Sequence, residues 1–258
     1  MQINFYFVVK LYFFMISKQK IKFISSLKHT KYRLKFNCFI AEGEHVVRSF
    51  MESNFKVNSL FATKEWIEKN KSSDSCCVTK RELGRISCLK NPSDVLAIIQ
   101  KPNSKFEKTK ENTQFPIVLL DGIADPGNMG SIIRTADWFG LNSIYLSEQC
   151  VDVFNPKVVQ ATMGSLARLN VFYVDSSQFL YSLKEKKITC YGACLSGKNI
   201  YTLDREAKSA IVFGNESHGI SLETQKVLDD KILIPRKNKL IDSLNVAVSF
   251  GIILSEFR

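Results

Sequence analysis

The sequence lacks several patterns that would assign a function at once. Its seven cysteines are odd in number and include no C-x-x-C pair. This argues against a disulfide framework and a zinc site, and it favours reduced thiols in a cytoplasmic protein. Neither G-x-G-x-x-G nor G-x-x-x-x-G-K-S/T occurs, so the fingerprints of dinucleotide and nucleoside triphosphate binding are absent. Three histidines without a serine or cysteine partner nearby in sequence make a hydrolase triad an unfavoured interpretation.

A membrane-spanning run and a secretion signal are also missing from the beginning of the chain. The apolar run there reaches only Ile16, is broken by Lys10 and falls short of the ~20 residues that a span needs. No small-residue cleavage site follows it. We interpret residues 1–14 as a non-native or disordered upstream extension, and we expect translation in the cell to start at Met15.

Positive charge is concentrated in the first part of the chain. Residues 1–115 hold 21 Lys+Arg against 10 Asp+Glu, whereas residues 116–258 hold 15 of each, so the net charge of +11 lies in the first part. Such asymmetry predicts a nucleic-acid partner, with a well-solvated surface as the alternative. A short amphipathic helix beginning near Lys18 is expected to carry several of the basic residues that displace counterions from phosphates. The basic candidates are Lys18, Lys20, Lys22, Lys28, Lys31, Arg33 and Lys35.

Alternating strand and helix patterns predict an α/β protein of two domains. A small α/β unit covers residues 15–100, with strands expected at 38–41, 57–62, 76–78 and 95–100 and helices at 42–51 and 64–69. Residues 101–115 are polar and form a linker. In residues 116–258 we expect strands at 117–120, 143–146, 170–174, 188–195, 210–214 and 231–234, and helices at 157–166, 179–186, 222–228 and from 243. This alternation predicts a parallel sheet.

The stretch from Pro116 to Gly140 is the centre of the second domain. An apolar run predicts a buried strand, and the turn after it ends on Asn128, a residue that commonly starts a helix. Apolar residues then recur at helical spacing, and Arg134 lies off that face with its side chain leaning toward Asn128. Open α/β sheets bind ligands at such strand ends. An ordinary strand–turn–helix unit with a surface arginine is the alternative.

Two further strand ends carry small and polar residues. Gly214 and Glu216 follow the strand expected at 210–214, and a glycine there allows a ligand to approach the backbone. After the last strand, Ser243 is expected to cap the final helix, whose inward stripe would hold Leu244, Ala247, Val248 and Gly251, while Asn245 points away from it. Each loop alone is weak evidence, because Gly and Asn populate ordinary turns.

Taken together, the three loops resemble the SpoU (TrmH) family of the SPOUT RNA methyltransferases. The matching motifs are N-M-G-S-I-I-R-T at Asn128–Thr135, F-G-N-E at Phe213–Glu216, and S-L-N-V at Ser243–Val246 after Ile234 and Pro235. The first domain also resembles the family's L30e-like substrate-binding domain through F-I-A-E-G-E-H-V-V at Phe39–Val47.

The resemblance implies a parallel sheet threaded as a deep trefoil knot, and a homodimer formed through the C-terminal domain. It also implies methyl transfer from S-adenosylmethionine to a ribose 2′-hydroxyl of RNA, with 23S ribosomal RNA favoured over transfer RNA and no metal. By position, the catalytic group would be Asn128, Arg134, Glu216, Ser243 and Asn245. Leu195, Gly214, Ile234 and Leu244 would line the cofactor pocket, and the basic residues between Lys18 and Lys35 would bind RNA. A non-catalytic RNA-binding dimer is the alternative.

The residue types suit that reaction. A 2′-hydroxyl is a poor nucleophile until its proton is removed or its developing charge is stabilised. A guanidinium is effectively always protonated, so Arg134 would bind the phosphate and the developing oxyanion, and would act as a base only if its pKa fell drastically. Asn128 and Glu216 would orient Arg134, while Ser243 and Asn245 would position the substrate.

One loop departs from the family's pattern. The family usually has seven residues from the proline to the serine and a glycine between them, whereas here Pro235 to Ser243 is eight and Asn238 stands in place of the glycine. Since Asn tolerates the left-handed conformation, we expect the turn to survive. His218 is interpreted as a loop residue and not as a base.

Overall fold

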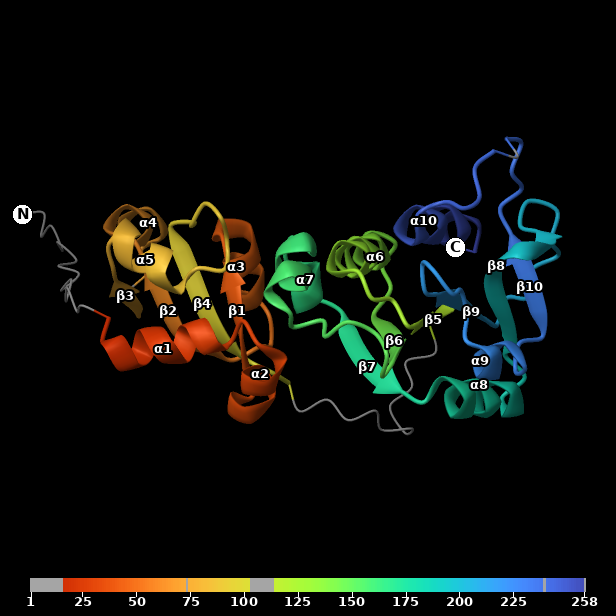
Figure 1. The fold of residues 1–258 in the computed structure, drawn as a ribbon, viewed down its shortest axis with the longest axis horizontal. Helices are drawn as coiled ribbons and strands as arrows, with labels where there is room; N and C mark the ends of the chain where they lie inside the picture. The colour runs from red at the N-terminus through yellow and green to blue at the C-terminus, as the bar shows by residue number, and fades with distance from the viewer. Residues whose placement is uncertain (1–15, 73, 103–113, 239, 258) are drawn as a thin grey trace, which may run out of the picture. The chain divides into compact units, whose positions relative to one another are not determined.

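The computed structural model describes residues 16–72, 74–102, 114–238 and 240–257. The chain divides into two units, Met1–Lys101 and Pro102–Arg258 (Figure 1). The expectations for residues 1–14 and for most of the linker at 101–115 fall outside the described residues.

The first unit is a four-stranded mixed sheet with helices on both faces. Its strand order is β1-β4-β2-β3, with β4 antiparallel to both of its neighbours and β2 parallel to β3. The elements are α1 (Lys18–Ser26), α2 (Thr30–Phe36), β1 (Cys38–Glu42), α3 (Glu44–Met51), β2 (Val57–Ala62), α4 (Lys64–Asn70), β3 (Ser75–Cys77), α5 (Lys80–Ile86) and β4 (Val95–Gln100).

Alternate residues of β1 supply the two faces of this sheet, as the pleat requires. Ile40 packs in one apolar cluster with Ile24 of α1 and Leu83 of α5. Phe39 lies on the other face, where its ring meets Phe50 of α3 with centroids 5.3 Å apart. The strands expected from the sequence are present within a residue of their predicted bounds.

The helix expected at 42–51 begins later, at Glu44 of α3. Glu42 is the last residue of β1 and is buried, and its carboxylate accepts hydrogen bonds from Ser87 Oγ and from the Cys88 backbone N–H at 2.6 Å. A buried carboxylate needs such donors. Glu42 therefore fixes the turn after α5 and is not part of α3.

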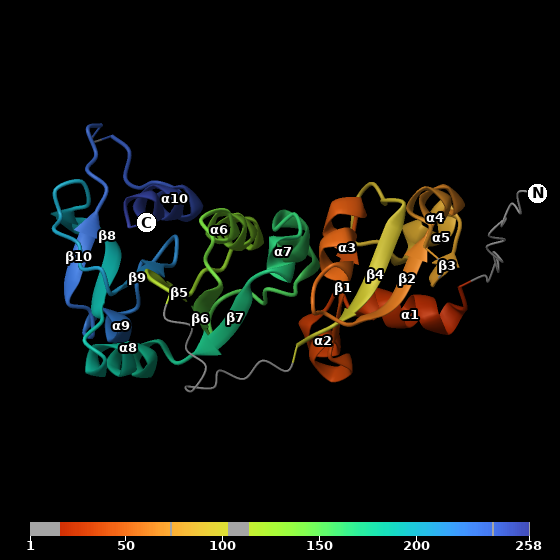
Figure 2. The ribbon, with the colours of Figure 1, turned by 180° about the vertical axis from the view of Figure 1, so that it is seen from behind.

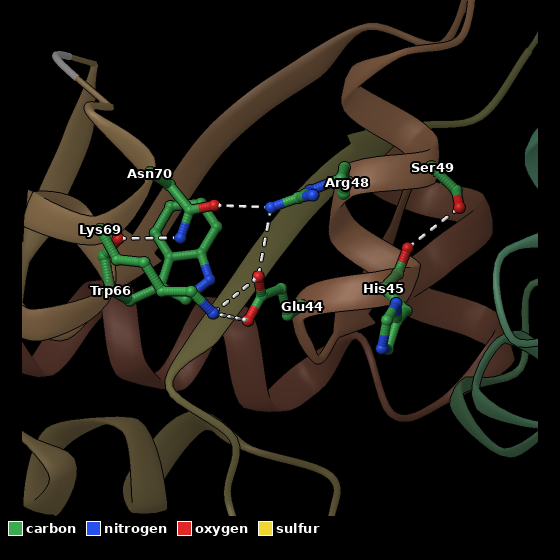
Figure 3. Close-up of polar contacts among 7 residues, drawn as sticks. All are labelled: Glu44, His45, Arg48, Ser49, Trp66, Lys69 and Asn70. Carbon is green, nitrogen blue, oxygen red and sulfur yellow. Dashed lines mark hydrogen bonds and ion pairs between the residues drawn. The ribbon is translucent and has the colours of Figure 1, made fainter.

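Polar contacts tie α3 to α4 on the surface of the first unit (Figure 3). Glu44 Oε2 lies 3.1 Å from Lys69 Nζ, and Arg48 Nη2 donates both to Glu44 and to Asn70 Oδ1 at 2.8 Å. The hydrogen bond from Lys69 lowers the pKa of Glu44 below its ordinary value. Glu44 lies in the F-I-A-E-G-E-H-V-V motif, and here its carboxylate holds two helices together.

The second unit is a six-stranded sheet in which every strand pair is parallel. The strand order is β10-β8-β9-β5-β6-β7. The strands are β5 (Ile117–Asp121), β6 (Ser143–Ser147), β7 (Asn170–Val174), β8 (Thr189–Asn199), β9 (Ser209–Gly214) and β10 (Asp230–Leu233). The helices are α6 (Pro126–Trp138), α7 (Pro156–Ala161), α8 (Ser176–Glu185), α9 (Leu222–Gln225) and α10 (Val246–Glu256), with a 3-10 turn at Ser165–Ala167. The expected parallel α/β sheet is confirmed.

Helices cover both faces of this sheet. Figure 2 shows α6, α7 and α10 together on one side and α8 and α9 on the other. Phe213 of β9 meets Phe250 of α10 with ring centroids 4.9 Å apart, while Phe179 of α8 stacks on Tyr145 of β6 at 4.3 Å. A Cβ on Gly130 of α6 would lie 2.3 Å from Ala161 Cβ, so a glycine is required where α6 and α7 meet.

The start of α6 differs from the sequence-based expectation. The helix begins at Pro126 and is capped by Asp125, whose carboxylate accepts a hydrogen bond from the Asn128 backbone N–H at 2.8 Å. Aspartate followed by proline is a strong helix start, because the cap accepts an orphan N–H and proline lacks one at the first position. Asn128 therefore lies in the first turn and its side chain is released from capping.

The last helix also begins later than expected. Asn245, not Ser243, caps α10, and the buried stripe is formed by Phe250, Ile253 and Leu254. Leu244 and Val248, expected inside, are 49% and 51% exposed. The helix is apolar on every side, so spacing alone does not say which side faces the sheet.

The ends of one helix and one strand also differ from the ranges expected from the sequence. The helix expected at 157–166 ends at Ala161, because Met163 and Gly164 adopt positive φ and only a 3-10 turn follows. The strand expected at 188–195 continues to Asn199, since β8 pairs with β10 on either side of a register jump.

Candidate active site

Three loops that follow parallel strands converge at one edge of the second unit's sheet. The strands are β5, β9 and β10, and since all pairs in this sheet are parallel, their carboxyl ends lie at the same edge. The loop after β5 leads into α6, the loop after β9 contains Glu216, and the segment after β10 leads to Asn245 at the start of α10. This is where ligands bind in open α/β sheets.

Asn128 joins all three loops. Its Nδ2 donates to Glu216 Oε1 at 2.8 Å, and its Oδ1 accepts from Asn245 Nδ2 at 2.8 Å. We call these three residues the amide–carboxylate cluster. The structure thus brings together Asn128, Glu216 and Asn245, which lie far apart in the sequence.

The orientation of both amides follows from the hydrogen bonds at the start of α10. Asn245 Oδ1 accepts from the backbone N–H of Ala247 at 2.9 Å and of Val248 at 3.3 Å, so its NH₂ group must face Asn128. Asn128 then presents its carbonyl oxygen to Asn245 and its own NH₂ to the Glu216 carboxylate. The hydrogen bonds run in one direction, from the N-terminus of α10 to Glu216.

Asn215 fixes the loop that carries Glu216. Its Nδ2 donates to the carbonyl of Gly122 at 2.7 Å, and its Oδ1 accepts from the backbone N–H of Ser217 and His218 at 2.8 and 3.2 Å. Sequence reasoning assigned Asn215 no role, although it stands inside the F-G-N-E motif. His218 is exposed within this turn, as a loop residue would be.

Gly214 is needed because the backbone doubles back on itself. A Cβ there would lie 2.2 Å from the carbonyl carbon of Gly219 and from the backbone nitrogen of Ile220. Asp121, buried at the end of β5, accepts from the Ser221 backbone N–H at 2.9 Å and so ties this loop to the central strand. The signal that could have identified Asp121 is a carboxylate that directly ends a buried apolar strand.

Arg134 and Ser243 form no hydrogen bond with the amide–carboxylate cluster in the described part of the chain. Both are exposed, and within the described ranges neither side chain forms a hydrogen bond or ion pair. Arg134 lies on α6, the helix whose first turn carries Asn128. The expected orienting bonds from Asn128 and Glu216 to Arg134 are therefore not present, because those two side chains bond to each other.

The expected cofactor residues lie at the same ends of the sheet. Gly214 ends β9, Ile234 follows β10, and Leu195 lies in the later half of β8. Leu195 is 75% exposed and Leu244 is 49% exposed. Exposed apolar side chains such as these are compatible with an uncharged planar base, but the carry-over of the four residues to a cofactor pocket stays a prediction.

The lengthened loop before α10 closes in a way that the sequence did not predict. Asn238 is not among the described non-glycine residues with positive φ; its side chain accepts from the Leu240 backbone N–H at 2.9 Å. Arg236 Nη1 also donates to the carbonyl of Ile241 at 3.2 Å. Asn238 thus contributes to this turn through its side-chain oxygen and not through a left-handed backbone.

Among the basic candidates of the first unit, Arg33 is an exception. It is fully buried, and its guanidinium donates to the carbonyls of Leu27 and Lys28 at 3.0 and 2.9 Å and to Thr30 Oγ1 at 2.9 Å. It braces the turn between α1 and α2 and cannot contact RNA. The six lysines of the set are exposed: Lys18, Lys20, Lys22, Lys28, Lys31 and Lys35.

The part of the chain that the structure describes contains neither a metal-binding cluster nor a membrane-spanning helix. No group of three or more His, Cys, Asp or Glu side chains there is placed to hold a metal ion. No helix there is long and apolar enough to cross a membrane.

Comparison with known proteins gives matches over both units. The model of the SpoU rRNA Methylase family matches residues 116–255, and the model of the MRM3-like substrate binding domain matches residues 18–97. The 23S rRNA (guanosine(2553)-2′-O)-methyltransferase RlmP of Bacillus subtilis is 28% identical over 244 residues, which cover 93% of this chain and 96% of that protein.

Solved structures of RNA methyltransferases also match this chain. A TrmH-family protein from Porphyromonas gingivalis superposes with a TM-score of 0.83 at 32% identity, covering 95% of this chain and 99% of the other. An rRNA methyltransferase from Sinorhizobium meliloti, solved with AdoMet bound, superposes with a TM-score of 0.83 at 27% identity. The match covers 95% of this chain and 96% of that one. The matches fall on the same residues as the sequence motifs, and they confirm the resemblance.

Proposed function

Because the chain belongs to the SpoU rRNA methylase family, we propose that it transfers a methyl group from S-adenosylmethionine to a ribose 2′-hydroxyl of ribosomal RNA. The relatives that support this substrate include RlmP, whose name specifies a 23S rRNA 2′-O-methyltransferase. The S. meliloti relative with bound AdoMet supports the cofactor. In this proposal residues 15–100 bind the substrate and residues 116–258 carry out the transfer.

The observation that carries the proposal is the amide–carboxylate cluster. A non-catalytic scaffold has no need of a one-directional hydrogen-bond chain that joins three loops at the ligand edge of a sheet. Each member uses its polar atoms for this purpose, since Asn245 caps α10 and bonds Asn128, and Asn128 bonds Glu216. The cluster holds the loops at fixed separations, and much of the rate of a transfer reaction comes from such positioning.

Each residue has a distinct part in the proposed reaction. S-adenosylmethionine, when bound, supplies an electrophilic methyl group on a sulfonium. Arg134, exposed and unpaired within the described ranges, binds the phosphate next to the target ribose and stabilises the negative charge that develops on the 2′-oxygen. Glu216 Oε1 is held by Asn128, and in the proposed reaction its second carboxylate oxygen contacts the substrate. Ser243 lies two residues before the Asn245 cap, where its hydroxyl can position the ribose.

The proposed cofactor contacts are Leu195, Gly214, Ile234 and Leu244. Leu195 and Leu244 are 75% and 49% exposed, so a bound cofactor would have access to both side chains. The proposed RNA contacts are the six exposed lysines between Lys18 and Lys35, because positive charge on α1 and α2 displaces counterions from the RNA backbone.

We further propose a homodimer formed through the second unit, whose last segments are threaded as a trefoil knot. An exposed apolar surface supports the dimer, since Trp138 of α6 is 85% exposed and Val248 of α10 is 51% exposed. The seven free cysteines accord with a cytoplasmic protein.

The experiment that tests the function is transfer of a labelled methyl group from S-adenosylmethionine to unmodified ribosomal RNA, with transfer RNA as a parallel substrate. We expect label in ribosomal RNA as 2′-O-methylribose. Titration calorimetry with S-adenosylmethionine alone separates the enzyme from a non-catalytic RNA-binding dimer, because a scaffold would give no binding heat.

A further inference from the structure

We propose that the α1–α2 hairpin is a stacking platform for unpaired RNA bases. Its binding face is a ring ladder formed by Phe23, His29, Tyr32 and Phe36. This inference rests on the proposed function in that it specifies which form of RNA the first unit binds. It concerns RNA binding alone, so it can be tested without methyl transfer.

The rings of the ladder are already ordered against one another. Tyr32 and Phe36 lie one helical turn apart on α2, with ring planes 12° apart and centroids at 6.2 Å. Phe23 of α1 meets the Phe36 ring edge-on at 5.0 Å, and His29 meets Tyr32 at 6.4 Å. A preordered ring surface loses little conformational entropy when a base stacks on it.

Of the four rings, Phe23 is partly buried and packs against the core cluster that contains Ile24 and Leu83. The buried side chain of α2 is Arg33, and Phe36 is 39% exposed. Arg33 anchors the helix through its hydrogen bonds to Leu27, Lys28 and Thr30. Because Arg33 is the buried side chain of α2, the rings of Tyr32 and Phe36 both remain partly exposed.

The charge around the ladder selects an anionic partner. Lys31 Nζ lies 5.3 Å from the centroid of Tyr32, and Lys35 Nζ lies 5.5 Å from that of Phe36. The first acidic residue of the sequence is Glu42, and none of the six exposed lysines forms an ion pair with a residue that the structure describes. Both ammonium groups lie over the ring faces in cation–π contacts, and a strand that alternates phosphates and bases can engage the charges and the rings together.

The same combination favours unpaired over paired RNA. Bases in a duplex already stack on one another, and the deep major groove of A-form RNA does not admit side chains. Single-stranded segments offer both faces of each base, and stacking on a protein ring contributes ~1–3 kcal/mol per base. The ladder therefore binds a loop or single-stranded segment of the substrate RNA.

The test measures binding of the full chain to an unstructured RNA of about 12 nucleotides and to the same strand annealed to its complement, by fluorescence anisotropy over a range of salt. We expect the wild type to prefer the single strand. The double variant Tyr32→Leu/Phe36→Leu keeps apolar volume and charge, and it should weaken single-strand binding about 10-fold or more with an unchanged salt slope. Leu34→Ala is the matched control, because Leu34 is 64% exposed on the same helix but has no ring; its affinity should change less than about twofold.

A second measurement needs no variant. RNA carrying 5-iodouridine, irradiated with the wild-type chain, should crosslink to Tyr32 or Phe36, as identified by peptide mass spectrometry. Equal or tighter binding of the duplex, crosslinks confined to other residues, or anionic vesicles bound through the rings in place of RNA would overturn the inference. Methyl transfer to ribosomal RNA with no such stacking would leave the proposed function standing, whereas ring-dependent RNA binding without methyl transfer would leave this inference standing.

Discussion

Asn245 donates from its Nδ2 to Oδ1 of Asn128 over 2.8 Å, although 117 residues separate the two in the chain. Asn245 caps α10 with the opposite end of the same amide. One side chain thus starts a helix and joins two loops, so its two roles can be separated by substitution.

Asn245→Asp should separate them. Aspartate is as good a helix cap as asparagine but has no N–H to donate to Asn128. We expect the melting temperature to stay within a few degrees of wild type and methyl transfer to fall at least ~10-fold. Asn245→Ala is the control, since it removes both roles and should also cost about 1 kcal/mol of stability. Full activity of Asn245→Asp would show that the bond to Asn128 is dispensable.

Arg134→Ala should abolish methyl transfer and leave S-adenosylmethionine binding measurable by calorimetry. The reason is that the guanidinium, exposed on α6, contacts RNA and the developing oxyanion rather than the cofactor. Arg134→Lys, which keeps the charge but not the planar fork, should retain a small part of the activity. Turnover at the wild-type rate in Arg134→Ala would remove Arg134 from the reaction.

Gly214→Ala should destabilise the protein by about 1–3 kcal/mol, because a Cβ would lie 2.2 Å from the backbone of Gly219 and Ile220. Urea unfolding measures the change. The matched control is Gly251→Ala in α10, where the added Cβ would lie at an ordinary 3.8 Å from Thr135 Cγ2. Alanine favours a helix over glycine by roughly 0.5–1 kcal/mol, so this control should be neutral or stabilising; equal effects at the two sites would contradict the account.

Arg33→Met should lower stability, whereas Lys31→Ala should weaken RNA binding and leave stability unchanged. Arg33→Met keeps the buried stem but leaves the carbonyls of Leu27 and Lys28 without their donor, at a cost of about 1–3 kcal/mol. Lys31 is exposed, so its removal should leave the melting temperature unchanged and reduce the salt slope of RNA binding by about 0.7. A thermally normal Arg33→Met would show that the buried guanidinium does not support the hairpin.

Cys88 and Cys190 should resist alkylation in the folded protein. Burial raises the pKa of both thiols from an ordinary value of 9.0 to about 12, with smaller contributions from Glu42 near Cys88 and from Asp229 near Cys190. At pH 8 the reactive thiolate is therefore scarce.

The same shift of the thiol pKa makes the stability of the fold depend on pH. The thiols lose their protons at lower pH in the unfolded chain than in the folded one, so the free energy of unfolding should fall as the pH rises from about 9 to about 12. Mass spectrometry after iodoacetamide treatment checks the labelling, and rapid modification of either thiol at pH 8 without denaturant would be the contrary result.

The strands and the parallel sheet could be predicted because short apolar runs between helical patterns have few other uses. The starts of α6 and α10 could not. Asp125 and Asn128 can both cap a helix, as can Ser243 and Asn245, and the choice depends on loops that meet only in three dimensions. The sequence did single out the members of the amide–carboxylate cluster, but it gave no sign that Asn128 bonds Glu216 rather than Arg134.

The burial of Arg33 was also beyond prediction. It lies in a run of basic residues whose other members are exposed, and α2 has no apolar stripe that would reveal which side faces inward. Its neighbours in space are carbonyl groups of the preceding turn. A local pattern of charge predicts the kind of partner for the whole segment, but not which arginine serves the fold.

The most direct test of the central claim is site-resolved mapping of 2′-O-methylation on ribosomal RNA after incubation with the purified chain and S-adenosylmethionine. The account predicts one new 2′-O-methylribose with the wild type and none with Arg134→Ala, while both proteins bind S-adenosylmethionine. Methylation of a base, or no methylation of ribosomal or transfer RNA by a protein that binds S-adenosylmethionine, would contradict it.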